Sequence, residues 1–472
     1  MIRMGRKIIV ALLLTWSVIA QAMTPDLKAK VLADVSDVIN KKAFVPGLDM
    51  DAWTRHVAKH QAELDAAETV DAYTKALNRA CREFGVSHLS VRTPAQEKRR
   101  STRQAAGFGI RVTDGEHVLH VVEVNPNGPS VGKGLDAGDE IILVDGRVPD
   151  EIEDLQGEVG SKSILKVRKG DGGVVELELE RKTFSLDRPD TLTWIDPESA
   201  VLRINTFMQG YKRDAITKLC EEAARAKYLI LDLRGNGGGQ VSNLRHLLGH
   251  FLPANTTIGA FIGKNVVNNF REAGQGDGND PIAVAKWSPR KFRTDNAQSP
   301  VITGRVGVLI DRGSASASEI TSAALREMLD APLVGTKTAG AVLASTYEKI
   351  EGGFSVQYPA SDYVTGKGIR LEKNPLKPDL EIATESRPAS RGTASRPRVL
   401  VATTPAQDPM VRKALELIRT REPHPDVLVA ASRPAREGAG PDAPRDGGTA
   451  PATRPRRTGR TPTSRPTRGR GD

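Results

Sequence analysis

The sequence contains only two cysteines, Cys81 and Cys220, among its 472 residues. Both lie in stretches that favour helix, so the sequence predicts core thiols and no disulfide framework, even in an exported protein. A cysteine nucleophile at Cys81 is disfavoured, because no tight turn displays its side chain. Covalent chemistry, if the chain has any, is therefore expected from another residue type.

Long apolar runs are also scarce. One run of about thirteen residues follows the basic residues Arg3, Arg6 and Lys7, and it leads into Ala20, Gln21 and Ala22, a typical cleavage pattern. The run is short for a membrane-spanning helix. Residues 1–22 therefore predict a signal peptide, and we expect an exported protein of the periplasm or the extracellular space.

Acidic residues are few at the two ends of the chain, which accounts for most of the formal charge of +10. Residues 430–472 contain ten arginines and four acidic residues, with little apolar content, and they are expected to be disordered. Such a tail favours weak contact with anionic surfaces through non-specific charge, or no function at all. No specific nucleic-acid partner is expected.

Patterns typical of metal and nucleotide sites are missing. The pairs His56 with His60 and His246 with His250 have the four-residue spacing of some zinc sites but lack H-E-x-x-H, so we expect helix-surface histidines and no metal. The glycine run at 235–239 is not followed by G-K-[ST], which argues against a phosphate-binding loop. The sequence therefore predicts no cofactor.

What the sequence does contain is a pattern for displaying a serine. Residues 306–310 form a continuous β-branched and apolar run typical of a buried strand, and a helix is expected to begin near Glu319. Between them, Gly313 and alternating Ser and Ala allow a sharp turn around Ser316, where backbone N–H groups and the helix N-terminus favour a developing oxyanion. The alternative is that these serines only cap the helix.

A second buried-strand pattern, at residues 228–233, precedes the run R-G-N-G-G-G. Consecutive glycines cost conformational entropy on folding. Chains keep such runs where backbone must approach a ligand, or where N–H groups must point into open space, as in an anion-binding nest. The run therefore indicates a second part of the same site.

Together these two segments resemble the C-terminal processing, or tail-specific, serine peptidases, and the resemblance covers about residues 70–385. It implies that Ser316 is the nucleophile. It also implies that the oxyanion hole is formed by the N–H of Ala317 and that of Gly237 or Gly238. The implied fold is a mixed α/β catalytic domain, with sheet and helices of the ClpP/crotonase-like type.

The general base departs from the common pattern of this family. Lysine-dependent members carry T-F-G-K-G after the nucleophile helix, and Ala341 stands where that lysine would be. Lys337 matches a lysine without a catalytic role in some members. The Ser87-His88 pair instead resembles the tricorn-core branch, which implies His88 as base, oriented by Ser87, with Ser87 held in turn by Glu372.

Residues 107–183 resemble a PDZ domain. The signature L-x-x-G-D-x-I-x-x-V-D-G ends at Gly146, and it follows a G-F-G-I stretch. The resemblance implies that Gly107, Phe108, Gly109 and Ile110 form a carboxylate-binding loop beside a strand edge that pairs with a peptide. The alternative is that Phe108 and Ile110 are ordinary core residues.

The predicted organisation is a signal peptide, a helical region ending in the Ser-His segment, a PDZ-like domain, a peptidase domain, an extension with a short helix, and a basic tail. Their expected bounds are 1–22, 23–100, 105–184, 185–385, 386–429 and 430–472. A polar, glycine-rich insertion at 260–300 is expected to border the cleft. The oligomeric state is not predicted.

Two functions follow from these patterns. The first is an exported serine endopeptidase that cleaves proteins through an acyl-enzyme, with protein or peptide substrates recruited by their free C-termini. The second is a catalytically inactive binding protein on the same scaffold, which the missing lysine favours. The retained Ser316 and the Ser87-His88 pair favour the first.

Overall fold

The computed structural model describes residues 22–115, 117–149, 152–295, 302–382 and 404–421. The predicted signal peptide, except for Ala22, and the basic tail lie outside the described residues. Within these ranges the structure contains no helix that is both long and apolar enough to cross a membrane.

A six-stranded sheet forms the centre of the predicted catalytic domain. Strands β10, β11, β14, β15 and β18 run parallel, and β9 pairs antiparallel with β10 at one edge. Their apolar side chains alternate between two buried clusters, because Leu229 and Leu231 face one side while Ile230 faces the other. In spatial order the strands are β18 (Leu380–Glu381), β15 (Leu333–Gly335), β14 (Arg305–Ile310), β11 (Tyr228–Asp232), β10 (Ser199–Arg203) and β9 (Thr191–Asp196).

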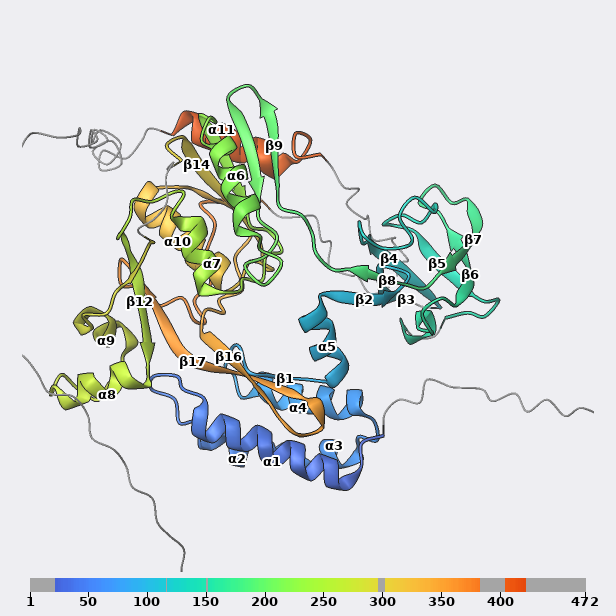
Figure 1. The fold of residues 1–472 in the computed structure, drawn as a ribbon, viewed down its shortest axis with the longest axis horizontal. Coiled ribbons are helices and arrows are strands. Elements are labelled where there is room, and N and C mark those ends of the chain that lie inside the picture. The colour runs from blue at the N-terminus through green and yellow to red at the C-terminus, as the bar shows by residue number, and fades with distance from the viewer. Residues whose placement is uncertain (1–21, 116, 150–151, 296–301, 383–403, 422–472) are drawn as a thin grey trace, which may run out of the picture.

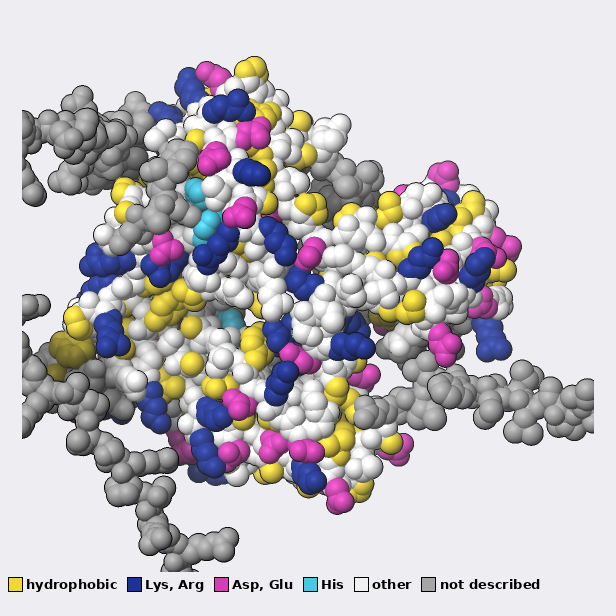
Figure 2. Space-filling view, in the orientation of Figure 1, with side chains coloured by type: hydrophobic (Ala, Val, Ile, Leu, Met, Phe, Trp, Pro, Cys, Tyr) yellow, Lys and Arg dark blue, Asp and Glu magenta, His cyan; other side chains and the backbone are white. Residues whose placement is uncertain are grey.

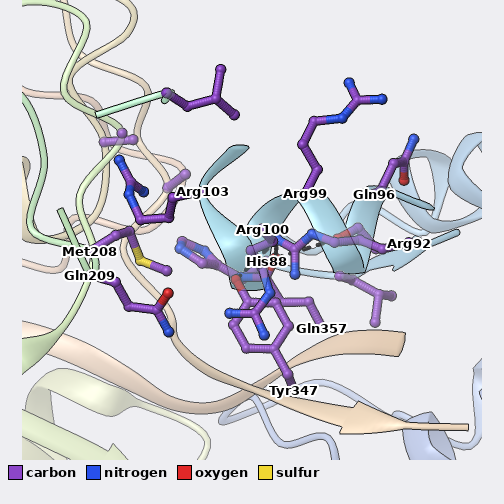
Figure 3. A pocket seen from close by; sticks show the side chains of 16 residues that line it. His88, Arg92, Gln96, Arg99, Arg100, Arg103, Met208, Gln209, Tyr347 and Gln357 are labelled. Carbon is purple, nitrogen blue, oxygen red and sulfur yellow. Dashed lines mark hydrogen bonds between the residues drawn. The ribbon is translucent and has the colours of Figure 1, made fainter. Parts of the chain in front are cut away.

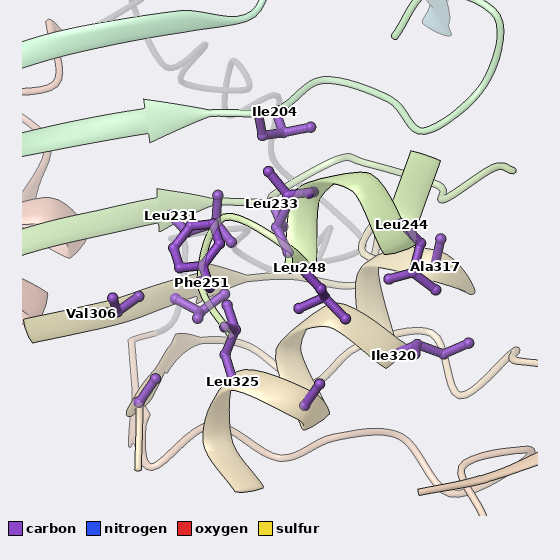
Figure 4. Close-up of a cluster of buried hydrophobic side chains, with 14 of the residues drawn as sticks. Ile204, Leu231, Leu233, Leu244, Leu248, Phe251, Val306, Ala317, Ile320 and Leu325 are labelled. Atoms are coloured by element: carbon purple, nitrogen blue, oxygen red, sulfur yellow. The ribbon is translucent and has the colours of Figure 1, made fainter. Parts of the chain in front are cut away.

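Helices cover both faces of this sheet (Figure 1). The first face packs against α6 (Arg213–Ala223), α7 (Val241–Leu248) and α10 (Ala317–Leu329), and Figure 4 shows part of the resulting core. The second face packs against α11 (Pro409–Thr420). This is the short helix that the sequence predicts in the extension, and Asp408 caps it, since Asp408 Oδ1 accepts a hydrogen bond of 2.8 Å from the N–H of Met410.

A second sheet is antiparallel and lies against the N-terminal helical region (Figure 1). Its long strand β17 pairs with β1, β12 and β16, and β12 pairs with β13. The strands are β1 (Ser90–Arg92), β12 (Thr257–Gly263), β13 (Phe292–Arg293), β16 (Ala344–Lys349) and β17 (Ser355–Thr365). The helices of the N-terminal region are α1 (Pro25–Lys42), α2 (Ala52–Val57), α3 (Gln61–Ala66) and α4 (Val70–Glu83).

The insertion predicted at 260–300 is largely regular structure where it is described. It contains α8 (Lys264–Glu272) and α9 (Pro281–Trp287), whose Val267, Phe270 and Val284 are buried against β12. The polar, glycine-rich centre is confined to the connection between these two helices. The sequence analysis did not identify the amphipathic helices on either side of this centre, because the centre itself is polar and rich in glycine.

The PDZ-like part is a five-stranded antiparallel sheet with its own core around Leu119, Val121 and Ile141. Its strands, in spatial order, are β3 (Ile110–Gly115), β4 (Val118–Val124), β5 (Glu140–Val144), β6 (Lys162–Arg168) and β7 (Val174–Glu180). A ribbon of β2 (Gln104–Gly107) and β8 (Lys182–Ser185) joins it to the rest, next to α5 (Pro94–Thr102). The predicted fold class, an α/β core with a β-rich module and an N-terminal helical region, is confirmed.

Candidate active site

Ser316 occupies a strained turn between β14 and α10. Its backbone has φ 56° and ψ −115°, which is rare for a residue with a side chain. The turn is packed against Gly238, where an added Cβ would lie 2.6 Å from the carbonyl oxygen of Ala315 and 2.8 Å from the Cβ of Ser316. The glycine run is thus required for the sharpness of this turn.

The three serines of the turn differ in what their side chains do. Ser314 Oγ donates to the carbonyl of Leu233 at 2.8 Å, and Ser318 Oγ donates to that of Asn236 at 2.7 Å. Both side chains are buried. Ser316 is half-buried and forms a capping box with Glu319, yet its hydroxyl donates to no other described residue. Ser316 is therefore the serine with a hydroxyl available for chemistry, although the capping alternative also holds for it.

Asn236 ties the glycine run to the serine turn. Its buried side chain donates to the carbonyl of Ile204 at 2.8 Å, and its own carbonyl accepts from the N–H of Ala315 at 3.1 Å. Its Oδ1 accepts the N–H of Gly238 at 3.0 Å. These bonds fix the two loops against each other before any ligand arrives.

The hydrogen bonds distinguish Gly237 from Gly238, either of which the resemblance implied as an oxyanion donor. The N–H of Gly238 is already donated to Asn236, so Gly238 has a steric role. The N–H groups of Gly237 and Ala317 donate to no described residue, and the space around Gly237 is open. Ala317 also lies at the N-terminus of α10, where the helix dipole favours negative charge.

Glu319 is a site residue that the sequence interpretation missed. Its buried carboxyl accepts hydrogen bonds from the N–H groups of Ser316, Gly340 and Ala341 at 3.1, 2.8 and 3.0 Å, and from Thr338 Oγ1 at 2.5 Å. Burial raises its pKa, and these donors oppose the rise. The S-x-x-E spacing after Ser316 was the available signal.

The structure joins Ser87, His88 and Glu372 in one hydrogen-bonded chain. Ser87 Oγ donates to Glu372 Oε2 at 2.9 Å and lies 2.9 Å from His88 Nδ1. Because the single hydroxyl proton of Ser87 is donated to the carboxylate, the Ser87 oxygen accepts a hydrogen bond from the N–H at Nδ1 of His88. The neutral imidazole then carries its free electron pair on Nε2, the form needed in a general base.

Local structure explains why these three residues meet. Helix α4 ends before Gly85, which has φ 77°, and His88 has φ 57° just ahead of β1. Glu372 is buried and also accepts the N–H of Val342 at 2.9 Å. The adjacent residues Ala341 and Val342 thus donate to two different carboxylates, Ala341 to Glu319 and Val342 to Glu372. They link the turn of Ser316 to the segment of Ser87 and His88.

Burial lowers the pKa of His88 from its ordinary value, and the negative charge of Glu372 partly opposes this. The imidazole is consequently neutral at pH 7. A neutral ring with a free Nε2 is able to accept a proton at physiological pH.

One cleft of about 640 Å³ connects these parts (Figure 3). His88, Gly237, Ala315 and Ala341 all line it. Ser316 itself is not among the lining residues, although its neighbour Ala315 is, and Ser316 and His88 share no hydrogen bond in the described structure. The insertion at 260–300 was expected to border the cleft, and that expectation is wrong for its described residues, none of which lines it.

The two lysines that are near Ala341 in the sequence, Lys337 and Lys349, lie outside the cleft. Lys337 and Lys349 are both exposed, and neither is among the residues that line the cleft. Ala341 lines it without a functional side chain.

In the PDZ-like part, the Gly107 to Ile110 loop presents backbone only. Phe108 is 3% exposed and packs in the core with Arg181 4.4 Å above its ring, so the alternative reading of Phe108 as a core residue holds for its side chain. The N–H groups of Phe108 and Gly109 donate to no described residue. Strand β3, which follows the loop, is at the edge of its sheet.

The remaining candidate ligands have structural roles. His246 and His250 are buried, which corrects the expectation of surface histidines, and His246 Nδ1 lies 2.8 Å from the hydroxyl of Tyr211. Cys81 and Cys220 are free and buried as predicted, and burial raises the pKa of each thiol to about 12. Among the described residues, no three His, Cys, Asp or Glu side chains are grouped to hold a metal ion.

An α/β sheet with a serine displayed at a strand-to-helix turn places the chain in the class of serine hydrolases. Comparison with known families agrees, since residues 198–382 match peptidase family S41 and residues 106–182 match the PDZ domain. The chain thus contains a peptidase family S41 domain and a PDZ domain, and it is similar to proteins named C-terminal processing proteases.

Individual relatives are distant. The carboxy-terminal processing protease CtpA of Bacillus subtilis is 26% identical over 284 residues, which span 58% of this chain and 55% of that protein. The chloroplastic C-terminal processing peptidase of Tetradesmus obliquus is 26% identical over 349 residues, 68% of this chain and 69% of that protein. A solved structure of a putative S41 protease from Bacteroides fragilis covers 82% of this chain and 96% of its own at 18% identity and a TM-score of 0.51, a likeness of fold.

Proposed function

We propose that this chain is an exported serine endopeptidase of the C-terminal processing type, with Ser316 as nucleophile and His88 as general base. The observation that carries the proposal is the hydrogen-bonded chain of Glu372, Ser87 and His88, which faces the displayed Ser316 turn across one cleft. Export rests on the pattern of residues 1–22, which lie almost entirely outside the described structure.

The proposed reaction begins when His88 Nε2 takes the proton of Ser316 Oγ, and the oxygen attacks the scissile carbonyl carbon. The N–H groups of Gly237 and Ala317 stabilise the resulting oxyanion. His88 then gives its proton to the leaving amine, which departs as the C–N bond breaks. Water repeats the sequence on the acyl-enzyme, releasing the acid and free Ser316. Ser87 and Glu372 act by holding the ring and stabilising its protonated form.

This scheme requires Ser316 and His88 to approach each other when substrate binds. Catalytic hydrogen bonds are often long or unformed in ligand-free structures and tighten in the substrate complex. Ala341 and Val342 contact Glu319, next to Ser316, and Glu372, next to Ser87. A small shift of this segment can therefore bring Ser316 and His88 closer together.

The second candidate function is an inactive binding protein on the same scaffold. Ala341 in place of the family lysine and the unformed contact between Ser316 and His88 favour it. The two candidates differ in one property, because only the enzyme has an activated serine.

A fluorophosphonate reagent tests that property, since it reacts covalently with activated serines. We expect the purified chain to be labelled at Ser316, as identified by mass spectrometry of the peptide that carries it. The His88→Ala variant is the control for activation by the base, and we expect it to remain unlabelled. Failure of the folded wild-type chain to react at Ser316 would favour the inactive binding protein.

Recruitment of substrates by the PDZ-like loop is a further part of the proposal. The free N–H groups of Phe108 and Gly109 beside the edge strand β3 support binding of a peptide α-carboxylate. We expect peptides that end in an apolar residue to bind the Ser316→Ala chain at least about tenfold more tightly as acids than as amides, measured by fluorescence anisotropy. Equal affinities would contradict the assigned role of this loop. Contact of the basic tail with anionic surfaces stays a prediction about residues outside the described structure.

A further inference from the structure

The cleft beside His88 is lined by four arginines, Arg92, Arg99, Arg100 and Arg103 (Figure 3). None of the sixteen described residues that line it is Asp or Glu. Figure 2 shows Lys and Arg side chains, with Asp and Glu side chains among them, across the middle of the face above the N-terminal helices. A concave surface with one sign of charge concentrates ligands of the opposite sign.

Two of the four arginines already have carboxylate partners. Arg100 binds Glu97 through two hydrogen bonds of 3.0 and 2.6 Å, and these bonds lower the pKa of Glu97, which therefore stays ionised. Arg103 forms an ion pair with Asp187. Arg92 and Arg99 form no ion pair among the described residues, although the charge of Arg92 also acts on Glu97, so positive charge is in excess around the cleft.

The side-chain hydrogen bonds of Arg92 go to neutral groups. Its Nη2 donates to Tyr347 Oη at 3.0 Å and to Gln357 Oε1 at 3.2 Å, and its guanidinium lies 4.4 Å from the centre of the Tyr347 ring. The guanidinium of Arg100 lies 4.8 Å from the same ring centre. One aromatic ring thus positions two cationic groups in the cleft.

The remaining Nη1 of Arg92 is buried and has no hydrogen-bond partner among the described residues. A buried charged donor without an acceptor is costly and rare in native structures. Its neighbours Tyr347, Gln357 and Arg100 all line the same cleft. A ligand in the cleft can supply the acceptor that Nη1 lacks once these neighbouring side chains shift to expose it.

We propose that Arg92, assisted by Arg99 and Arg100, binds a carboxylate of the substrate peptide in the cleft next to His88. A planar guanidinium with an unpartnered Nη1 suits a carboxylate, whether it belongs to an Asp or Glu side chain or to the end of the chain. This inference rests on the proposed peptidase function, and it adds a preference for acidic substrates that is separate from the PDZ-like loop.

The test uses amidated peptides, so that no α-carboxylate is available to the PDZ-like loop. Matched pairs carry Glu or Gln at successive positions on either side of the scissile bond. Binding to the Ser316→Ala chain is measured by fluorescence anisotropy, and kcat/KM is measured on the wild-type chain. At one position we expect Glu to be preferred over Gln by at least about tenfold in both measurements, with a smaller ratio at high salt.

The variant Arg92→Gln should reduce that ratio to about one while the Gln peptide is bound as before. Arg92→Lys keeps the charge and should retain part of the preference, and the exposed Arg99→Gln variant should lower it less than Arg92→Gln does. Thermal unfolding of each variant verifies folding. A third comparison measures the affinity of the Gln peptide with a free C-terminal carboxylate and with an amidated C-terminus. If the acid is bound more tightly and this preference disappears in Arg92→Gln, the bound carboxylate is the one at the end of the peptide.

The two proposals fail in different ways. If the Ser316→Ala chain binds all peptides equally and Arg92→Gln changes nothing, water solvates Nη1 and the carboxylate site is overturned, whether or not the wild-type chain cleaves. If Glu peptides are bound preferentially through Arg92 but the wild-type chain cleaves none, the carboxylate site stands and the peptidase function fails.

Discussion

Ser316→Ala is expected to lower peptide hydrolysis by roughly 10³- to 10⁶-fold, the range seen when one member of a catalytic triad is lost. The reason is chemical, because the variant has no oxygen to form the acyl-enzyme. Folding should be preserved, since Ser316 is half-buried and its hydroxyl donates to no other described residue. The measurement is the initial rate on a fluorogenic peptide, with circular dichroism and thermal unfolding as checks of the fold.

Ser318→Ala is the matched control from the same turn. Its buried hydroxyl donates to the carbonyl of Asn236, so its loss should destabilise the chain by about 1–3 kcal/mol. The turnover of folded Ser318→Ala molecules should stay near the wild-type value. An inactive but folded Ser318→Ala enzyme, together with an active Ser316→Ala enzyme, would mean that the nucleophile has been assigned to the wrong serine.

The parts of the site that sequence reasoning reached are those encoded in short segments. A buried strand followed by small residues predicted the turn at Ser316, and three glycines in a row predicted a close backbone approach. Both are local patterns whose physical cost is visible in the residues themselves. The partnership of Ser87 with Glu372 spans 285 residues of sequence, and it came only through resemblance to a family.

Other features depend on which distant segments meet, and the sequence alone did not indicate them. The capping box at Glu319 was visible, but its bonds to Thr338, Gly340 and Ala341 were not, because they join separate parts of the chain. The same holds for the arginines of the cleft, which meet Tyr347 only when β1, α5 and β16 assemble. Periodicity predicts elements, while such sites depend on tertiary contacts.

The assignment of Gly237 and Gly238 shows a finer limit. Both glycines fit the pattern of an oxyanion donor, and nothing in the sequence distinguishes them. The hydrogen bond from Gly238 to Asn236 does so, because a donated N–H is no longer available to a substrate oxygen. Gly238 is nevertheless indispensable, since any Cβ there would collide with the turn that carries Ser316.

His88→Ala is expected to lower kcat/KM by roughly 10³- to 10⁶-fold, comparable to the loss of Ser316. Ser87→Ala and Glu372→Ala should cost less, because these residues orient the ring and do not take the proton themselves. Burial lowers the pKa of His88, so wild-type kcat/KM should fall only as the pH drops through a value below about 6.5, where Nε2 becomes protonated. The pH profile of kcat/KM on an uncharged peptide measures this limb.

A lysine base would produce a different result on both counts. Its ordinary pKa of about 10.4 would have to be lowered by burial, and the acidic limb of the profile would then lie well above that of a buried histidine. Lys337 and Lys349 are exposed, so Lys337→Ala and Lys349→Ala should retain near wild-type turnover and serve as controls. A nearly normal His88→Ala enzyme beside an inactive Lys337→Ala or Lys349→Ala enzyme would show that a lysine, moved into the cleft when substrate binds, takes the proton instead.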